Sequence, residues 1–395
     1  MKTEYDILIV GAGLVGLTTA LCCAETGFSV GLMDRKAVTA GQDGRASALS
    51  ASSLRLMENL GLDLSSDVQP IRDMLVTEGT PDSPWRLHFE GDGDGGDLGG
   101  LIENQKLKAA LLSKVKATKA ITITAPLMIT EAVHDASGVN VVSNVGDFTA
   151  ALLVAADGRE STLRRKAGIN VQRFDYDACS LVTTIAHELP HDGLAWQRFL
   201  PGGPLAVLPL TEQRSQIVWS GPAAQIKAAE ALDEADFLAL LFEKMDGYLG
   251  QLQLTAPRVS WPLRLQVADQ FTADRLALVG DAAHVIHPLA GQGLNLGLRD
   301  AAALADGLKA AKETGQDIGV AGLLDYESAR NSDTRLMGAT THALANLYRI
   351  NSPALGHARR LGLVLTNRSG IITSALRKEA AGETGSLPGL MRRRF

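Results

Sequence analysis

The sequence is poor in cysteine, and this scarcity limits what the protein can be. Its 395 residues include three cysteines, Cys22, Cys23 and Cys179. Cys22 and Cys23 are adjacent on a predicted helix and cannot easily bridge each other. We therefore expect neither a disulfide framework nor a cysteine-based metal site, and the natural compartment is the reducing cytoplasm.

Long apolar runs and strong charge are also missing. No stretch of roughly 18 apolar residues occurs, so we expect no transmembrane helix. The polar start at residues 1–6 is unlike a signal peptide. A formal net charge of −6 is mild and argues against nucleic-acid binding, which usually needs a basic face. No Gly-x-Ser-x-Gly motif is present, so a serine hydrolase is poorly supported.

A nucleotide-binding signature opens the chain. Residues 5–34 predict a buried strand, a glycine turn, a helix and a second strand. Gly11, Gly13 and Gly16 permit a tight turn and a close approach of the backbone to a pyrophosphate, and the helix N-terminus favours its negative charge. Asp34 ends the second strand, where a carboxylate can accept hydrogen bonds from ribose hydroxyls. This motif predicts dinucleotide binding but does not separate FAD from NAD.

A second strand–turn–helix unit lies far downstream, at residues 275–300. We predict a short buried strand from Leu276 to Val279, a Gly280-Asp281 turn, a glycine-rich loop and a helix that begins near Gly293. The Asp281 carboxylate can bind ribityl hydroxyls, and the helix dipole would stabilise the negative charge of a reduced flavin. Close approach of the backbone to a flat ring is expected at three glycines: Gly291, Gly293 and Gly297. Two separated units indicate one long cofactor with an end in each, which points to a flavin dinucleotide.

Asp157 and Gly158 follow another predicted buried strand, at residues 148–156. Two interpretations stay open for the segment that ends at Arg164. It is either a surface turn capped by Ser161 or, given the second unit downstream, part of the cofactor channel.

The spacing of His284 and His287 allows a metal site with Asp281, but we do not favour one. No further ligand cluster is evident, and His287 precedes Pro288, whose ring restricts the local backbone. Packing or hydrogen bonding is the better interpretation of both histidines.

Length and a hydrophobic content of 46% indicate two domains or one elaborated α/β body. We predict an α/β fold with a discontinuous Rossmann-like FAD-binding domain at 1–171 and 271–330. A sheet-plus-helix substrate domain is inserted at 172–270, and a helical segment follows at 331–395. Within these limits we expect one helix over 46–60 and one over 223–245.

The three motifs resemble those of the FAD-dependent aromatic hydroxylases, the group that includes p-hydroxybenzoate hydroxylase. The matching fingerprints are the Gly11 turn, Asp157-Gly158 and Gly280-Asp281. Within that group, residues 287–300, 102–107 and 261–263 are similar to the ubiquinone-biosynthesis hydroxylases. The resemblance covers nearly the whole chain.

The resemblance implies roles for named residues. Asp34 would hold the adenosine ribose, although family members often have Glu there. Asp157 and Arg164 would serve the pyrophosphate region or NAD(P)H, and Pro288, with His287 beside it, would lie near the reacting centre. The full set expected to bind the cofactor is Gly11, Gly13, Leu14, Gly16, Asp34, Arg35, Arg45, Gln105, Asp157, Arg164, Gly280, Asp281, Gly291, Gly293, Leu294 and Asn295.

The resemblance also implies a reaction. The protein would use FAD, NAD(P)H and O2 to hydroxylate an aromatic ring, with a polyprenylphenol of ubiquinone biosynthesis as the expected substrate. The sequence shows no separate Rossmann unit for NAD(P)H, so the reductant would be a transient visitor. The substrate would lie under the inserted domain, near residues 196–209 and Trp219.

Partners and rival functions remain open. The arginine-bearing C-terminal helices either contact a membrane, at its inner face, or form an ordinary packed tail. Membership of a ubiquinone-biosynthesis assembly is a further expectation. The alternatives are a hydroxylase of a small soluble aromatic and a flavin-binding scaffold subunit with little activity, whereas a flavin halogenase lacks its Trp-x-Trp-x-Ile-Pro motif here.

Overall fold

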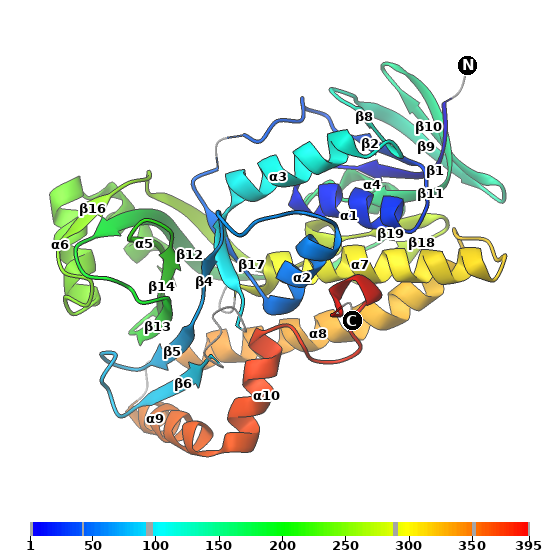
Figure 1. The fold of residues 1–395 in the computed structure, drawn as a ribbon. Coiled ribbons are helices and arrows are strands. Elements are labelled where there is room, and N and C mark those ends of the chain that lie inside the picture. Colours follow the sequence, from blue (N-terminus) through cyan, green and yellow to red (C-terminus); the bar gives the residue numbers. More distant parts are fainter. Residues whose placement is uncertain (1–2, 42, 92–97, 287–290, 350–352, 394–395) are drawn as a thin grey trace.

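The computed structural model describes residues 3–41, 43–91, 98–286, 291–349 and 353–393. Two large sheets lie at opposite ends of an elongated molecule, joined by long strands and by a long helix that passes beneath both (Figure 1). The predicted architecture is confirmed: a Rossmann-like α/β unit, a second sheet-plus-helix unit and a helical C-terminal stretch.

The first sheet has the strand order β18-β19-β11-β1-β2-β8, with β10 and β9 added through β11. Its strands are β1 (Thr3–Val10), β2 (Val30–Met33), β8 (Ile121–Thr124), β9 (Ile129–Asp135), β10 (Gly138–Ser143), β11 (Gly146–Ala155), β18 (Thr272–Ala273) and β19 (Leu276–Leu278). β1 pairs in parallel with β2 and β11, and β11 pairs in parallel with β19. The strands at residues 7–9 and 276–278 are fully buried, as their continuous apolar runs predict.

Helices α3, α1, α7 and α8 pack side by side against this unit. Their bounds, with those of two shorter helices nearby, are α1 (Leu14–Glu25), α2 (Ala51–Asn59), α3 (Asn104–Ala117), α4 (Thr162–Lys166), α7 (Gln292–Glu313) and α8 (Ala321–Arg349). The parallel strands therefore end where α1 and α7 begin, the usual place for a ligand in an α/β fold.

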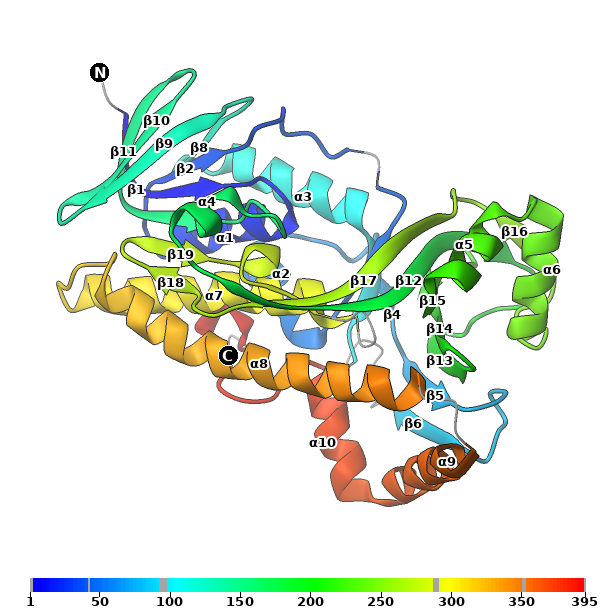
Figure 2. The ribbon, with the colours of Figure 1, turned by 180° about the vertical axis from the view of Figure 1, so that it is seen from behind.

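The second sheet has the order β20-β17-β12-β15-β14-β13-β5-β6, with β16 paired to β12 (Figure 2). Its members are β5 (Asp73–Thr77), β6 (Arg86–Glu90), β12 (Val171–His187), β13 (Leu194–Leu200), β14 (Gly203–Leu210), β15 (Arg214–Pro222), β16 (Leu252–Leu254), β17 (Val259–Ala268) and β20 (His284–Val285). Helices α5 (Ala223–Ala231) and α6 (Glu234–Lys244) cover one face. β5 and β6 come from outside the predicted insertion at 172–270, so the second sheet recruits strands from both sides of that boundary.

Two predicted helices are wrong in part. Residues 46–49 form β3 (Ala46–Leu49) in a small sheet with β7 (Gly100–Glu103) and β4 (Gln69–Pro70), because β7 supplies antiparallel hydrogen bonds there. Ser50 then caps α2 by accepting a hydrogen bond from Ser53 N at 3.3 Å. The helix predicted over 223–245 breaks at Leu232, and the Asp233 carboxylate caps α6 by accepting from Asp236 N.

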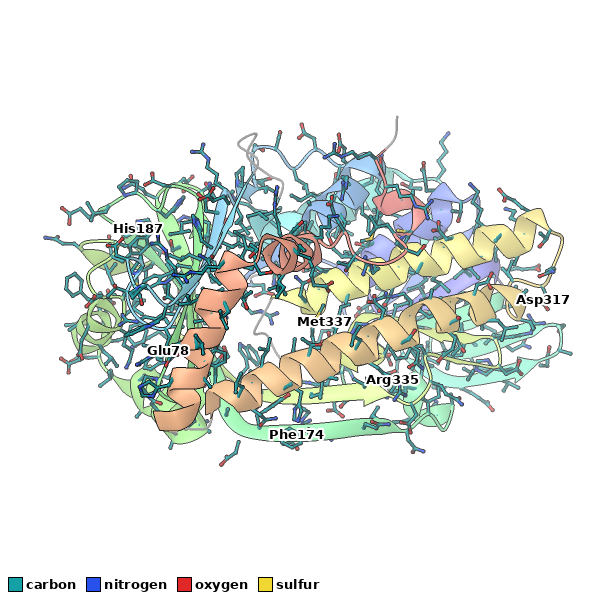
Figure 3. The ribbon with its side chains drawn as sticks, turned by 90° about the horizontal axis from the view of Figure 1, so that it is seen from below. Glu78, Phe174, His187, Asp317, Arg335 and Met337 are labelled. Carbon is teal, nitrogen blue, oxygen red and sulfur yellow. The ribbon has the colours of Figure 1, made fainter. Side chains whose placement is uncertain are left out.

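The C-terminal segment runs away from the first unit through two helices, and its last residues return to pack against that unit. From α8 the chain continues through α9 (Pro353–Arg368) and α10 (Gly370–Ala380) (Figure 3). The short helix η3 (Gly389–Met391) then packs against α2 and α7, where Gly389 N donates to Asp306 Oδ2 at 2.7 Å and Asn59 Nδ2 donates to Leu390 O. α9 and α10 thus meet at a corner beside Ser369 in a segment held at both ends (Figure 1), which we call the α9–α10 hairpin.

Candidate active site

The three glycines of the first turn differ in what surrounds them. Gly11 has φ +109°, and a methyl group built on it would lie 2.2 Å from the Ala156 carbonyl oxygen. A methyl group on Gly16 would lie 1.9 Å from the Gly11 carbonyl oxygen. One on Gly13 would meet no atom within 4 Å. Gly11 and Gly16 are therefore needed for the protein's own packing, whereas Gly13 borders open space at the start of α1.

Asp34 holds this turn to the end of β2. Its Oδ2 accepts from Ala12 N at 2.8 Å and its Oδ1 accepts from Lys36 N at 2.8 Å. Of its neighbours, Leu14 packs against the main core and Arg35 is exposed. The carboxylate therefore lies at the glycine turn, where the sequence predicts a ribose contact.

Asp157 stands at the end of β11, beside the same turn. Its Oδ2 accepts from Thr162 N at 2.8 Å, while its Oδ1 is buried and has no hydrogen-bond partner among the described residues. The capping by Ser161 is confirmed, because its Oγ accepts from Arg164 N at 3.1 Å. An unpaired buried carboxylate oxygen is costly unless something else bonds to it.

Arg164 joins this segment to the Asp281 turn. Its guanidinium is buried and donates to Ala282 O at 2.7 Å and to Arg159 O at 3.1 Å. Burial lowers the pKa of Arg164. Both terminal nitrogens thus bind protein carbonyls, so this side chain positions the downstream turn.

Gly280 and Asp281 form the short helix η1 (Gly280–Ala282) directly after β19. Gly280 has φ +58° and packs against Val15 of α1. The Asp281 side chain is exposed to solvent, yet crowding by surrounding protein raises its pKa, with His284 and Arg159 opposing the shift. The Asp281 carboxylate is therefore open to solvent at the end of β19, where a ligand can reach it.

A buried charge cluster behind this turn was not predicted. Asp300 Oδ2 accepts from Gly280 N at 2.9 Å and from His284 Nε2 at 2.6 Å, and Asp300 Oδ1 accepts from Arg330 Nε at 2.8 Å. Burial alone would raise the pKa of Asp300, but His284 and Arg330 lower it to about 2. The expectation that His284 serves hydrogen bonding is confirmed. Arg330 lies on α8 and belongs to no sequence motif. Its role becomes visible only in the structure, through its contact with Asp300 of α7.

The start of α7 completes the cluster. Gly291 has φ +61°, and neither it nor Gly13 provides a side-chain cap for the helix that follows it. The space beside Gly293 is open, and Leu294 packs partly against the main core. Uncapped helix N-termini leave free N–H groups and positive potential directed at a ligand.

Two predictions for α7 need correction or refinement. Gly297 does not border open space: a methyl group on it would lie 2.7 Å from Val15 Cγ2 and 3.2 Å from Gly280 Cα. It permits helix-to-helix packing, not ring contact. The Asn295 side chain accepts from Ser50 N at 3.0 Å and donates to Ala48 O at 2.9 Å. The Asn295 side chain therefore ties the start of α7 to the segment 48–50.

Arg45 and Gln105 approach the cluster from other segments. Arg45 forms a two-bond ion pair with Asp43, at 2.7 and 2.8 Å, which raises the Arg45 pKa. It lies close enough to Asp281 for their charges to interact. Gln105 is exposed in the first turn of α3.

The remaining predicted positions, His287 and Pro288, lie outside the described residues. Within the described ranges, no group of three or more His, Cys, Asp or Glu side chains is arranged to hold a metal ion. Nor is any helix there long and apolar enough to span a bilayer.

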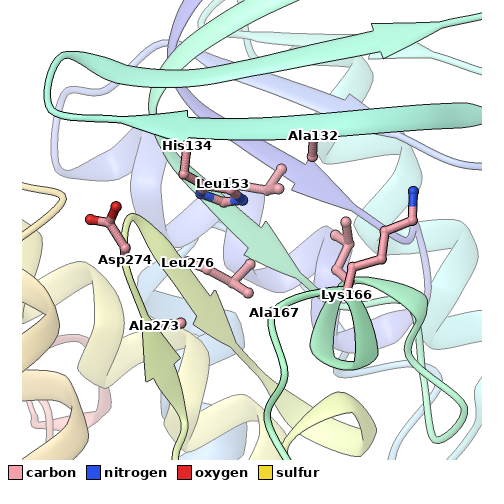
Figure 4. Close-up of a pocket in the computed structure, with 9 residues that line it drawn as sticks. Ala132, His134, Leu153, Lys166, Ala167, Ala273, Asp274 and Leu276 are labelled. Atoms are coloured by element: carbon pink, nitrogen blue, oxygen red, sulfur yellow. The ribbon is translucent and has the colours of Figure 1, made fainter.

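A cavity of about 240 Å³ opens on the far side of β11 (Figure 4). Its lining includes His134, Lys166 and Asp274. None of the predicted cofactor residues lines it, so it is separate from the cluster at Asp281.

The predicted substrate region divides into two faces. Trp196 and Trp219 are buried in the core between the second sheet and its helices, so these two side chains do not line a site near the cofactor. Strand alternation puts Leu208 on the opposite face, in an apolar layer that reaches Ala48 and Leu363. A methyl group on Gly291 would be 3.6 Å from Ala48 Cβ, so this layer adjoins the start of α7.

These features fit a bound flavin dinucleotide. The three turns meet at the ends of β1, β11 and β19, and both helices that start there lack side-chain caps. The unpaired Asp157 Oδ1 and the exposed Asp281 carboxylate could bond to a ligand, and the open space beside Gly13 leaves room for one.

Known proteins share this sequence and fold. The FAD binding domain family matches residues 4–337. The chain belongs to this family. It is 40% identical to the ubiquinone hydroxylase UbiL of Rhodospirillum rubrum over 95% of this chain and 89% of the relative. It is 32% identical to the 3-demethoxyubiquinol 3-hydroxylase of Escherichia coli over 95% of this chain and 98% of the relative.

Its fold is similar to that of p-nitrophenol 4-monooxygenase PnpA from Pseudomonas putida, with a TM-score of 0.79 and 19% identity, over 96% of this chain and 99% of that one. As a member of the family, this protein is an FAD-dependent monooxygenase. FAD is its cofactor, and NAD(P)H is the reductant typical of such enzymes.

Proposed function

We propose that this monooxygenase hydroxylates the aromatic ring of a polyprenylated intermediate of ubiquinone biosynthesis. Two sequence relatives that align over nearly the whole chain are named as a ubiquinone hydroxylase and a demethoxyubiquinol hydroxylase. The observation that carries the proposal is the 40% identity with a ubiquinone hydroxylase over 95% of this chain. The apolar layer between the second sheet and the start of α7 would form a wall against which the ring lies beside the cofactor.

The chain's own residues would bind and orient the cofactor. The turn at Gly11–Gly16 would take the pyrophosphate, Asp34 the adenosine ribose and Asp281 the ribityl hydroxyls. Asp157 Oδ1 would accept a hydrogen bond that it lacks within the protein. Bound FAD supplies electron transfer from NAD(P)H and activation of O2.

The start of α7 would govern charge at the reacting ring. Its first turn lacks a side-chain cap, so free N–H groups at Gly293 and Leu294 and the helix dipole would favour negative charge there. Arg45, whose charge interacts with that of Asp281, would add a positive charge, and Gln105 a polar contact. Pro288 and His287 stay proposed neighbours of the reacting centre.

The test is the product mass after aerobic incubation of the purified protein with NAD(P)H and a short-chain polyprenylphenol. We expect a gain of one oxygen atom. Consumption of NAD(P)H with peroxide as the product would instead mean that the flavin site works and the ring is wrong. Small soluble aromatics would then be tested, and failure of NAD(P)H to reduce the flavin with any of them would favour a scaffold subunit.

A further inference from the structure

The α9–α10 hairpin presents apolar side chains to solvent. Leu361 and Leu365 of α9 are 59% and 56% exposed, and Ile371 at the start of α10 is 87% exposed. Ile372 and Leu376 are exposed as well. Residues four apart share one face of a helix, so each helix carries an apolar stripe on its outer side.

The same hairpin is strongly basic. Residues 353–380 contain five basic residues, Arg359, Arg360, Arg368, Arg377 and Lys378, and one acidic residue, Glu379, in a chain of formal net charge −6. Arg368 and Lys378 are exposed next to the apolar stripes. Apolar stripes flanked by exposed cations are typical of helices that lie in the interface of a membrane with anionic lipids.

The opposite side of the hairpin is packed, so the exposed stripes belong to a folded element. Leu363 of α9 is buried in the apolar layer of the second sheet. Arg359 and Arg360 form ion pairs with Glu78, which lies beside α9 in Figure 3. The Arg360 guanidinium also lies 4.3 Å from the ring centroid of Trp85, which is partly exposed. A tryptophan at this position suits the headgroup level of a bilayer.

We propose that the hairpin, defined as residues 353–380, docks on the surface of a bilayer that contains anionic lipids. The exposed stripes enter the headgroup region, and Arg368 and Lys378 pair with lipid phosphates. This inference rests on the proposed function in one respect, because a polyprenylated substrate resides in a membrane. The apolar layer, which contains Leu363 and Ala48, then extends from the inner side of the docked helices to the start of α7.

Charge also argues against a second copy of this chain as the occupant. Two hairpins face to face would bring the exposed Arg368 and Lys378 of one copy against the same residues of the other, while the one acidic residue of the segment, Glu379, accepts a hydrogen bond from Thr384 of its own chain. Such like-charge contact destabilises an interface. An anionic lipid surface satisfies both the charge and the apolar area.

The experiment is co-sedimentation of the full-length, FAD-loaded protein with vesicles. Vesicles of phosphatidylcholine alone are compared with vesicles that also contain phosphatidylglycerol. We expect binding that needs the anionic lipid and weakens as salt is raised. Ile371→Glu and Arg368→Glu should each reduce binding by about tenfold, because one removes buried apolar area and the other reverses a charge.

The matched control is Val145→Glu, in the turn between β10 and β11 at the other end of the molecule. Val145 is 55% exposed, so the same exchange there should leave vesicle binding unchanged. Hydroxylation of a soluble short-chain substrate should be the same in all three variants, which shows that each is folded and loaded.

Three results would overturn the proposal. The first is failure of the unmodified protein to bind anionic vesicles, and the second is a reduction of vesicle binding by Val145→Glu as large as that by Ile371→Glu. The third is light scattering that shows the unmodified protein as a dimer and Ile371→Glu as a monomer. Failure of the proposed function is distinguishable, because vesicle binding would persist while no short-chain polyprenylphenol gains oxygen.

Discussion

The start of α7 and the α9–α10 hairpin differ in how closely their residues are packed. Around Gly280 and Gly297, the backbones of η1 and α7 approach closely against the Val15 side chain, and a buried carboxylate accepts three hydrogen bonds. On the hairpin, leucine and isoleucine side chains face solvent, and the described core contact is made by Leu363. A region that must hold a cofactor at fixed distances tolerates little change, whereas a region that adapts to a soft surface tolerates much.

The largest expected loss of stability follows from Asp300→Asn. The substitution removes the buried carboxylate that pairs with both Arg330 and His284 and leaves Arg330 with Asp333 alone, which should reduce the free energy of unfolding by about 4 kcal/mol. Urea unfolding of the apoprotein measures it. Glu313→Gln, which removes an exposed ion pair with Lys309, is the control and should change stability by less than about 0.5 kcal/mol. Equal effects of the two would show that the buried cluster adds nothing.

Asp300 also predicts a pH dependence. Its pKa is lowered from 3.8 to about 2 in the folded protein, so its ionised form stabilises the fold above the unfolded pKa. That contribution, of about 2 kcal/mol, is lost as pH falls from about 4 to about 2. Unfolding measured across this window should show the loss in the unmodified protein and a flatter profile in Asp300→Asn.

Gly11→Ala and Gly13→Ala separate packing from ligand binding. A methyl group on Gly11 meets the Ala156 carbonyl at 2.2 Å and strains a positive φ, so the apoprotein should lose about 3 kcal/mol of stability. Gly13→Ala should leave the apoprotein unchanged and weaken FAD, since the new methyl group projects into open space. Fluorescence titration with FAD and urea unfolding report the two quantities. Unchanged FAD affinity in Gly13→Ala would place the cofactor elsewhere.

Asp281→Asn should change affinity and stability in opposite directions. FAD binding should weaken by about a hundredfold, because a charge-assisted hydrogen bond to the ribityl chain is lost. Crowding raises the pKa of Asp281, so its protonated form favours folding and that contribution is lost as pH rises through the raised pKa. The apoprotein at pH 7 should therefore be slightly more stable with Asn. An Asp281→Asn protein that keeps full flavin occupancy would contradict the site.

The smallest effect should come from the outer side of the hairpin. Leu361→Ser should change the free energy of unfolding by less than about 0.5 kcal/mol, since the side chain is already exposed. Leu363→Ala, two residues away and buried in the apolar layer, should cost about 2 kcal/mol. A matched pair of urea curves decides this, and a large loss in Leu361→Ser would mean that Leu361 packs against protein in solution.

The sequence predicts features that depend on contacts between neighbours in the chain, and it misses those that depend on contacts between distant segments. The turn at Gly11 and the strand before Asp281 depend on neighbours in the chain, and both were predictable. The strand at 46–49 depends on hydrogen bonds from β7, so a local apolar pattern suggested a helix instead. Arg330 of α8 contacts Asp300 of α7, and no sequence spacing predicts a contact between these two helices. The glycine pattern predicted that Gly297 would lie against the flavin ring, but in the structure Gly297 packs against Val15.

The Asp300 cluster limits where the chain can be shortened. Arg330 lies on α8, and Arg299 of α7 donates to the carbonyls of Gly382 and Thr384 after α10. A truncation before residue 330 would strand a buried anion, and one after α8 would remove the segment that closes over α7. Excising residues 353–380 and rejoining the chain with a flexible linker is the deletion that spares both ends. The flavin-binding unit therefore continues to the last described residues, although its recognisable motifs stop at residue 300.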